Sequence, residues 1–514
     1  MALTGKHFIA GTRGGGGNSA DSFTTTNPSN GETLECEFLE ASQSDIDAAV
    51  AAADEAFDQL QTVTSDKIGD LLEAIADGID AAGDRLLDRA HAETGLPMGR
   101  LQGERGRTTN QTRIFAQMAR ADDWRQPRID EGNPERTPPK PDVRTMLFGV
   151  GPVVVFGASN FPLAISVVGT DTVSALAARC PVIVKAHPAH PGTCEILAEV
   201  ISEAVGKVGL PAGTFSLLQG KSNEFGKSLV QHPAVAAVAF TGSLRGGRAL
   251  FDAVNAREIP IPFYAEMGSS NPVFILPGAM KQRAAEIATG YVQSVNLGVG
   301  QFCTNPGIVL GVEGDALEQF LSAVKSSASD VSPATMLHPS IHKSYQDAQE
   351  NLESITGVEK IASSDQPPVD GAHQAACNIY GADISVLQKS SEVHDEVFGP
   401  SSVVLRCQST EQMLEYASSL DGHLTATIHG TEEDLNSNLK LVRLLQRKVG
   451  RIVFNGFPTG IEVCNAMHHG GPYPATTHSF YTSIGHQSIF RFAKPVCFQG
   501  FPKECLPPQL QCEA

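Results

Sequence analysis

The chain has 514 residues, of which 41% are hydrophobic and 18% charged, and its formal net charge at pH 7 is -19. At roughly 150 residues per domain, this length suggests about three domains, and the composition is typical of a globular protein with a large core. A strongly acidic chain repels phosphate backbones and anionic lipid, so we expect neither nucleic acid nor a membrane as a partner.

The ten cysteines are scattered along the chain, without a CxxC pair or a dense framework. This distribution argues against zinc ribbons and disulfide scaffolds and favours a reducing compartment, so we expect a cytoplasmic protein. The N-terminus has no apolar stretch of signal-peptide length. Residues 146–170 carry no charge, but they contain glycines and prolines, and Val153–Phe156 is predicted to be a buried strand rather than part of a membrane span. Residues 158–160 are predicted to form a turn that leads into a helix.

Residues 44–120 carry apolar side chains three and four positions apart, which predicts helices with a start at Ser44 and Asp45 and a stop at Gly95. Residues 124–146 are polar and rich in proline, which predicts a loop or an extended ribbon that leaves the globule.

Short β-branched runs then alternate with helical patterns. The predicted strands are 180–186, 214–220 and 234–243, and the predicted helices are 192–209 and 244–256. Such alternation indicates a parallel sheet with both faces covered.

Polar residues follow three of these predicted strands, at the edge where open α/β sheets bind ligands. In FTGSLRGG, Ser243 stands between a strand and a helix, where it can serve a phosphate at the helix N-terminus or act only as an N-cap. Lys185 and His187 end another strand in KAHPAHPG, and Lys221 follows the next. The GxGxxG fingerprint of ordinary Rossmann folds is absent.

NAD-binding strands often end with an acidic residue that binds the ribose hydroxyls. Pro188 and His190 occupy that stretch here, and the nearest acid along the chain is Glu195 in the following helix. A 2′-phosphate is therefore tolerated, and we expect NADP as the cofactor, with NAD as the alternative.

Two reactive side chains stand out further along. GQFCTNPG puts Cys303 in a Gly/Asn/Pro loop, where a thiol is more often reachable than in an apolar element. Glu266 stands among apolar residues, where a carboxylate can have a raised pKa and act as a general base. Taken alone, an ordinary loop cysteine and a surface glutamate at a strand end are the commoner interpretations of these two residues.

In chain order, ASNFP, VKAHP, FTGS, EMGSSNP, GQFC and EVFGP resemble the motif series of the aldehyde dehydrogenase superfamily, over roughly residues 20 to 500. FGASNFP, KAHPAHPGT, GQFCTNPG and HGGPYPAT look most like the α-ketoglutaric semialdehyde dehydrogenases. The C-terminal part departs from the Gly-Gly-x-Lys-x-Ser-Gly pattern of commoner members. The resemblance implies an α/β fold with two parallel-sheet domains and a β-ribbon that mediates oligomerisation.

The resemblance also implies roles for individual residues. The catalytic residues are Cys303 as nucleophile, Glu266 as the base that activates water, and Asn160 as an oxyanion donor. The cofactor-binding residues are Lys185, His187, Lys221, Ser243, Glu396 and Phe398. The substrate tunnel is implied to contain Phe161, Phe302 and Phe457, with Arg113 as the partner of a substrate carboxylate.

These roles imply NAD(P)-dependent oxidation of a small aldehyde to an acid through a cysteine thiohemiacetal and thioester. The resemblance favours 2,5-dioxopentanoate as substrate and 2-oxoglutarate as product. A broad or fatty aldehyde dehydrogenase that prefers NADP, a cysteine hydrolase and a non-catalytic scaffold remain as alternatives. His468 and His469 have no cysteine or carboxylate at ligand spacing nearby, so we expect no metal.

The implied domains are an NAD(P)-binding domain, a catalytic domain, and a ribbon with a tail. Their predicted ranges are 1–123 with 147–264, then 265–475, then 124–146 with 476–514. Because a ribbon leaves strand edges unpaired in a monomer, we expect a homodimer or a homotetramer.

Overall fold

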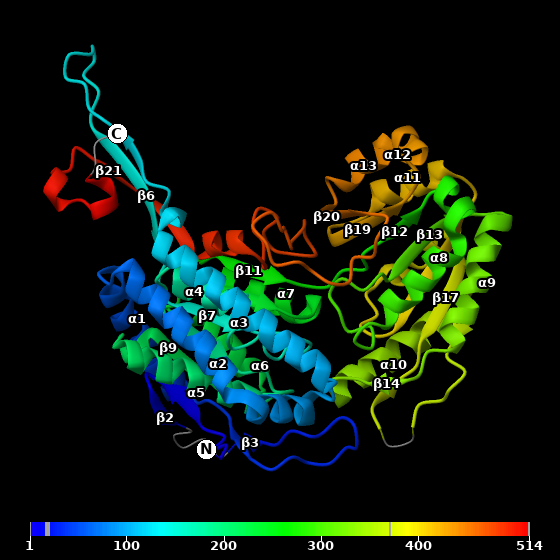
Figure 1. Ribbon diagram of the computed structural model, residues 1–514, viewed down its shortest axis with the longest axis horizontal. Helices are drawn as coiled ribbons and strands as arrows, with labels where there is room; N and C mark the ends of the chain where they lie inside the picture. Colours follow the sequence, from blue (N-terminus) through cyan, green and yellow to red (C-terminus); the bar gives the residue numbers. More distant parts are fainter. Residues whose placement is uncertain (1, 16–20, 370–371, 512–514) are drawn as a thin grey trace.

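The computed structural model describes residues 2–15, 21–369 and 372–511. Two α/β parts lie side by side, and a narrow ribbon projects from the first (Figure 1). The nine cysteines within the described residues are all free thiols, and Cys512 lies outside them. None of the helices in the described ranges combines the length and the apolar character that a bilayer span requires.

The first part is built on a seven-stranded sheet in the order β11-β10-β7-β8-β9-β1-β2. The first five strands are parallel, and β1 and β2 pair antiparallel at the edge. Their bounds are β11 Phe263–Glu266, β10 Ala237–Thr241, β7 Val153–Phe156, β8 Val182–Lys185, β9 Phe215–Leu218, β1 His7–Ile9 and β2 Thr12–Gly14. The predicted parallel sheet is therefore confirmed.

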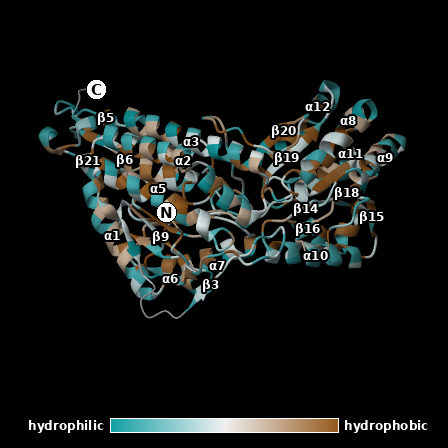
Figure 2. Cartoon of the chain, turned by 60° about the horizontal axis from the view of Figure 1, so that its bottom comes forward, coloured by the Kyte–Doolittle hydropathy of each residue, from teal (hydrophilic) through white to brown (hydrophobic). Residues whose placement is uncertain are grey.

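Helices cover both faces of this sheet because alternate residues of each strand point to opposite sides. Val153 and Val155 pack with α2 Ser65–Thr94, α3 Met98–Ala121, α4 Thr170–Ala177 and α5 Pro191–Val208. Val154 and Phe156 pack on the other face with α1 Gln43–Gln61, α6 Asn223–Gln231 and α7 Leu244–Asn255. Figure 2 shows the apolar residues gathered between these layers.

The second part contains a seven-stranded sheet in the order β15-β17-β18-β13-β12-β19-β20, in which only β15 is antiparallel to its neighbour. The strands are β12 Val273–Ile275, β13 Ile308–Val312, β15 Val358–Ser363, β17 Asn378–Asp383, β18 Ser401–Cys407, β19 His423–His429 and β20 Val449–Phe454. The helices are α8 Pro277–Asn296, α9 Asp315–Ser329, α10 Pro339–Ser354, α11 Thr410–Ser419, α12 Glu432–Ser437 and α13 Leu439–Leu445. Two apolar clusters, one with α8 and α9 and one with α11 and α13, cover its faces.

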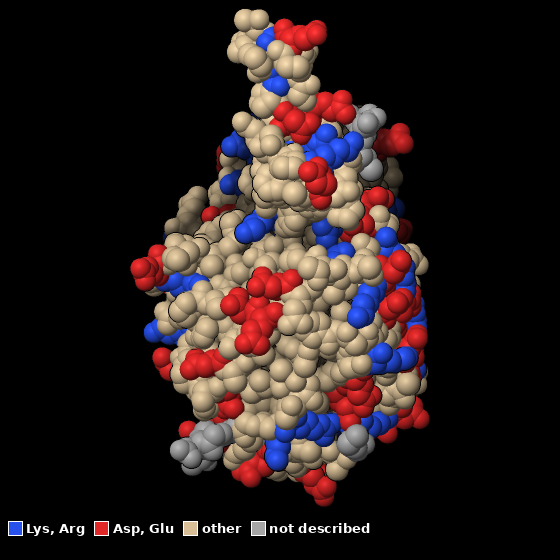
Figure 3. Space-filling model, turned by 90° about the vertical axis from the view of Figure 1, so that its left-hand side faces the viewer, with Lys and Arg blue, Asp and Glu red and all other residues tan. Residues whose placement is uncertain are grey.

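The projecting ribbon consists of β5 Arg128–Asp130, β6 Val143–Gly149 and β21 Ala493–Gln499, all antiparallel. Two of its strands come from the segment around 124–146 and the third from the C-terminal segment 476–514, which the prediction combined in one ribbon and tail. Acidic and basic side chains are interspersed on the face of the molecule that bears the ribbon (Figure 3). Two short pairs complete the strands, β3 Ser22–Phe23 with β4 Phe38–Leu39 and β14 Ala334–Thr335 with β16 Gln374–Ala375.

The strands β8, β9 and β10 are one to three residues shorter at each end than predicted, and two predicted helix starts also differ. Helix α1 is capped by Ser42, whose side chain accepts from Asp45 N–H, so it starts slightly before the predicted Ser44. The turn at residues 158–160 does not lead directly into a helix, because α4 begins only at Thr170. Gly95 ends α2 in the left-handed conformation, as predicted. The predicted domain limits remain predictions.

Arg179 has an unusual backbone conformation, with φ of 63° directly after α4. Its guanidinium donates hydrogen bonds to the carbonyl oxygens of Leu60 and Val63 and to the Ser65 hydroxyl. A left-handed residue without a glycine costs about 1–2 kcal/mol, whereas hydrogen bonds from a charged donor return about 1.5–3 kcal/mol. The side chain thus offsets the backbone cost by fastening the α1–α2 connection.

We expect Arg179→Ala to lower the free energy of unfolding by roughly 2 kcal/mol, because it keeps the strain and loses the hydrogen bonds. Arg179→Gly should be roughly 1 kcal/mol less destabilising than Arg179→Ala, since glycine adopts this conformation freely. Urea unfolding of the three proteins measures both differences. An alanine variant as stable as the wild type shows that the guanidinium contacts contribute nothing.

Candidate active site

A cavity of about 620 Å³ lies between the two parts. It opens against the carboxyl ends of β7, β8, β10 and β11, and α10 forms its far wall. The parallel strands deliver their ends to one edge of the sheet, which is where ligands bind in such folds. The predicted site residues that line it are Asn160, His187, Ser243, Glu266, Cys303, Glu396 and Phe398.

The loop that carries Cys303 is held from two sides. Gly298, Val299 and Gly300 all have positive φ values, and a Cβ at Gly300 would overlap the carbonyl oxygen of Gly399. The Asn271 side-chain amide donates to the carbonyl oxygen of Cys303 at 2.9 Å. The thiol is therefore partly buried in a loop of defined shape, not on a free surface turn.

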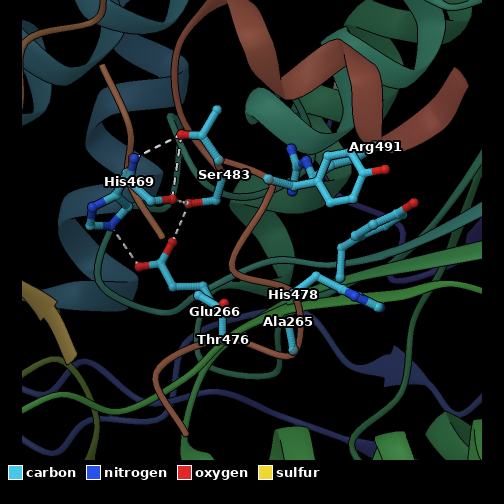
Figure 4. Close-up of a pocket in the computed structure, with 10 residues that line it drawn as sticks. Ala265, Glu266, His469, Thr476, His478, Ser483 and Arg491 are labelled. Carbon is cyan, nitrogen blue, oxygen red and sulfur yellow. Dashed lines mark hydrogen bonds and ion pairs between the residues drawn. The ribbon is translucent and has the colours of Figure 1, made fainter. Parts of the chain in front are cut away.

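Glu266 ends β11 and is 3% exposed. Its Oε1 lies 2.8 Å from His469 Nε2, and its Oε2 accepts a hydrogen bond from the Ser483 hydroxyl (Figure 4). Burial alone would raise the pKa of Glu266, but the charge and hydrogen bond of His469 and the hydrogen bond of Ser483 hold it below its usual value. The expected raised pKa was therefore wrong, and the carboxylate is ionised at neutral pH.

The sequence reasoning missed His469 and Ser483 as members of this site. His469 Nε2 also lies 3.5 Å from Cys303 Sγ, so the imidazole contacts both catalytic candidates. The two residues come from the loop between β20 and β21, far from Glu266 in the chain. The signal that could have found His469 is the departure of the HGGPYPATTHSF segment from the commoner family pattern, and Ser483 follows this segment by three residues.

The premise for expecting no metal was also wrong, since a thiol and a carboxylate do surround His469. The ligand atoms of Glu266, Cys303 and His469 lie within 4.8 Å of one another. Two ligands of one tetrahedral zinc, bonded at about 2.0–2.1 Å, stand about 3.3 Å apart. The 2.8 Å separation of Oε1 and Nε2 is instead a hydrogen-bond distance. The group is thus arranged for hydrogen bonding, and the absence of a resident metal stays a prediction.

Burial raises the pKa of the Cys303 thiol well above its usual value, and the negative charges of Glu266 and Glu396 raise it further. The positive charge of Arg107 acts in the opposite direction. The resting thiol is therefore protonated at neutral pH, and a reaction at the sulfur needs a base nearby.

Asn160 lies beside this thiol and is 6% exposed. Its side-chain amide donates to the carbonyl oxygen of Gln301 at 2.9 Å. Since an asparagine amide has two N–H donors, one remains for an oxygen in the cavity. The backbone carbonyl of Asn160 accepts from the Arg100 guanidinium at 2.7 Å, which holds the turn in place.

The cofactor side of the cavity combines a helix N-terminus with a carboxylate. Ser243 caps α7 by accepting from Gly246 N–H at 3.2 Å, and it also lines the cavity, so both interpretations of this serine are compatible. A Cβ at Gly268 would lie 2.6 Å from Glu396 Oε2, which means that Glu396 packs on bare backbone. The surrounding protein limits hydration of this carboxylate and raises its pKa to about 7.

Two predicted cofactor residues lie outside the described lining of this cavity. Lys185 ends β8, and burial of its ammonium lowers its pKa to about 8, against the opposing charge of Glu40. The Lys221 ammonium lies 5.7 Å from the Phe23 ring. Arg245 lines the cavity next to Ser243 and was not predicted.

Two of the predicted tunnel residues flank the reacting groups. Phe161 and Phe302, adjacent to Asn160 and Cys303, form an edge-to-face pair with ring centroids 5.3 Å apart. Phe457 instead packs against the His429 ring at 4.8 Å in the core of the second part, where Gly290 leaves room for it.

Arg113 does not reach the cavity either. Its guanidinium pairs with Asp77 at 2.9 Å and Asp80 at 3.0 Å on the neighbouring helix α2. At about 100° per residue, Arg113 lies on a different face of α3 from Arg107, whose charge does reach Cys303. The structure therefore removes Arg113 from the substrate site.

The sequence model of the aldehyde dehydrogenase family matches residues 16–477. The chain belongs to this family. It is 46% identical over 513 residues to alpha-ketoglutaric semialdehyde dehydrogenase 2 of Azospirillum brasilense, which covers 99% of this chain and 97% of that protein. It is 43% identical over 509 residues to alpha-ketoglutaric semialdehyde dehydrogenase of Acinetobacter baylyi, an alignment that covers 99% of this chain and 96% of that protein.

Solved aldehyde dehydrogenases share the fold. The Bacillus cereus enzyme in its NAD+ complex superposes with a TM-score of 0.81 at 22% identity, covering 97% of this chain and 96% of that one. A mutant of AldC from Pseudomonas syringae with NAD+ and octanal superposes with a TM-score of 0.82 at 19% identity, covering 97% of each chain. The chain is thus an aldehyde dehydrogenase with two parallel-sheet domains, and the predicted fold class is confirmed.

Replacing Glu266 by glutamine should lower the pKa of the Cys303 thiol, because it removes the negative charge that most strongly opposes ionisation. We expect the pH midpoint of iodoacetamide alkylation at Cys303 to move down, with faster labelling at pH 7.5. Mass spectrometry of the Cys303 peptide measures the rate, and Glu396→Gln should give a smaller shift. Slower labelling of the Glu266→Gln protein at every pH contradicts this expectation.

Proposed function

We propose that this aldehyde dehydrogenase oxidises 2,5-dioxopentanoate to 2-oxoglutarate with NADP. The observation that carries the chemistry is that Cys303, Glu266 and Asn160 line one cavity. The substrate assignment is supported by the two relatives named alpha-ketoglutaric semialdehyde dehydrogenase, which are 46% and 43% identical over 99% of this chain.

The residues present fit a nicotinamide dinucleotide. The N-terminus of α7, capped by Ser243, presents free N–H groups of the kind that bind phosphate, and Arg245 adds a positive charge beside it. Glu396 offers carboxylate oxygens to ribose hydroxyls, and Phe398 offers an apolar wall. When bound, the nicotinamide supplies the acceptor for the hydride that leaves the substrate carbon.

In the first half of the proposed mechanism, the thiol proton of Cys303 passes to the hydrogen-bonded pair of His469 and Glu266. The thiolate then attacks the aldehyde carbon and forms a thiohemiacetal. The free N–H of the Asn160 amide and the Cys303 backbone N–H hold the developing oxyanion. One such donor is worth about 3 kcal/mol of barrier.

In the second half, after the His469–Glu266 pair has released the thiol proton to solvent, Glu266 takes a proton from the water that attacks the Cys303 thioester. Its lowered pKa keeps it ionised for this role at neutral pH. The hydrogen bonds from His469 and Ser483 fix the carboxylate in place. Figure 4 shows Glu266, His469 and Ser483 turned toward one another around these hydrogen bonds.

Steady-state oxidation of 2,5-dioxopentanoate and hexanal, each with NADP and with NAD, tests the proposal. We expect kcat/KM to be higher for the oxo-acid aldehyde than for hexanal. Cys303→Ala should lower kcat/KM at least roughly 10³-fold, because it removes the nucleophile. If hexanal leads, the enzyme is a broad or fatty aldehyde dehydrogenase. Turnover of esters without nucleotide, together with no aldehyde oxidation, identifies a cysteine hydrolase, and no activity at all supports a scaffold.

The NADP preference is supported by the charges around Pro188, which lines the cavity just after β8. Glu195, the nearest acid along the chain, accepts from Thr4 N–H and Gly5 N–H at 2.8 and 2.9 Å and so faces the N-terminal segment. No aspartate or glutamate other than Glu266 and Glu396 lines the cavity among the described residues. A 2′-phosphate at this end would therefore meet no carboxylate in the lining, and the nearby Glu40 carboxylate is engaged by Lys221 N–H and Ser222 N–H and opposed by the charge of Lys185.

A carboxylate introduced by Pro188→Glu should repel a 2′-phosphate and accept from a 2′-hydroxyl. We expect kcat/KM with NADP to fall at least roughly 10-fold while kcat/KM with NAD stays within about threefold. An equal loss with both cofactors, or a wild type that strongly prefers NAD, contradicts the assignment.

We also keep the homodimer or homotetramer and the cytoplasmic location as proposals. Within the described residues, β21 and β5 each end the ribbon sheet with an unpaired edge. A second copy of the chain would pair or cover such an edge. The free thiols favour a reducing compartment.

A further inference from the structure

One face of α3 carries three charged side chains that point toward the site. Glu104 is 4% exposed, and its Oε1 accepts from Leu163 N–H at 2.8 Å and Ala164 N–H at 2.9 Å. Arg100 and Arg107 lie four and three residues away on the same helix, within electrostatic reach of this carboxylate. Two guanidinium groups therefore share the Glu104 carboxylate, which can neutralise only one of them.

Both guanidinium groups stack on the aromatic pair beside the reacting groups. Arg100 lies 5.1 Å from the Phe161 ring and 4.9 Å from the Phe302 ring, and Arg107 lies 5.4 Å from the Phe161 ring. Arg100 is further engaged by its hydrogen bond to Asn160. Arg107 has no such bond among the described residues, and its Nε is buried without a partner.

The charge of Arg107 faces the nucleophile. Burial lowers the pKa of Arg107, and the acidic groups that oppose this effect are Glu104, Cys303, Glu266 and Glu462. Arg107 is half-buried and its Nε is buried without a partner, so a carboxylate would supply the charge and the two acceptors that match its planar fork.

We propose that Arg107 binds the carboxylate of the substrate and is the residue that makes the enzyme select an oxo-acid aldehyde over an uncharged one. This inference rests on the proposed function. In 2,5-dioxopentanoate the carboxylate and the aldehyde carbon are four carbon–carbon bonds apart, or about 5 Å when extended. The anchor must therefore stand close to Cys303, which the position of Arg107 beside Phe161 satisfies and that of Arg113 does not.

The test compares Arg107→Met and Arg107→Lys with Arg113→Met, which removes the same charge from the surface of the same helix. Each protein is assayed with 2,5-dioxopentanoate and with pentanal, which has the same number of carbons and no charge. We expect Arg107→Met to raise the KM for the oxo-acid aldehyde roughly 30-fold or more. The KM for pentanal should stay within about threefold of the wild-type value. The KM of Arg107→Lys for the oxo-acid aldehyde should lie between the values of the wild type and Arg107→Met. Both KM values of Arg113→Met should match those of the wild type.

Equal losses for both aldehydes overturn the proposal, because they show that Arg107 acts on the thiol or on the fold. An unchanged oxo-acid KM in Arg107→Met overturns it too, as does a matching loss in Arg113→Met. If Arg107→Met does not fold, the comparison of the two substrates in Arg107→Lys decides.

Inhibition by 2-oxoglutarate separates this inference from the proposed function. If the wild type prefers pentanal, the proposed function fails, but the inhibition constant of 2-oxoglutarate still tests the anchor. A roughly 30-fold weaker inhibition in Arg107→Met supports a carboxylate site at Arg107. The same inhibition constant in wild type and variant overturns it.

Discussion

The Glu266 carboxylate is the group on which the rest of the site depends. It closes β11, accepts hydrogen bonds from His469 and Ser483, and through His469 reaches the Cys303 thiol. The backbone supports the same junction, because Met267 N–H donates to the carbonyl oxygen of Ala475 at 2.8 Å. The C-terminal segment is thereby fastened along the last strand of the first sheet. A buried carboxylate without these partners would be costly to keep ionised.

Charge around the thiol is balanced between opposing groups. Burial, Glu266 and Glu396 all favour the neutral thiol, whereas Arg107 favours the thiolate. Such an arrangement keeps the sulfur protonated until a base and a substrate are in place. Two positively charged side chains, Arg100 and Arg107, lie beside the aromatic pair of Phe161 and Phe302. The Glu104 carboxylate can neutralise only one of these two charges.

Local patterns in the sequence were sufficient for the four strands β7 to β10 of the first sheet and for two of the strand-end residues. Val153–Phe156 reads as a buried strand and is β7, and the helix after FTGS starts at the capping residue Ser243. Alternating strands and helices imply that strand ends share one edge, so Lys185, His187, Lys221 and Ser243 were expected to meet. His187 and Ser243 do line one cavity, whereas Lys185 and Lys221 lie outside its lining. These predictions succeed because strand periodicity and helix caps are local properties.

The sequence by itself determined the family, the parallel α/β architecture and the motif residues Cys303, Glu266 and Asn160, because short contiguous motifs carry them. Only the tertiary structure decided that His469 and Ser483 join Glu266, and that Arg107 rather than Arg113 faces the thiol. It also reversed the expected pKa shift of Glu266, since that shift depends on partners some two hundred residues away in the chain. Which face of a helix is buried, and which distant loop closes a site, depends on packing that no local pattern encodes.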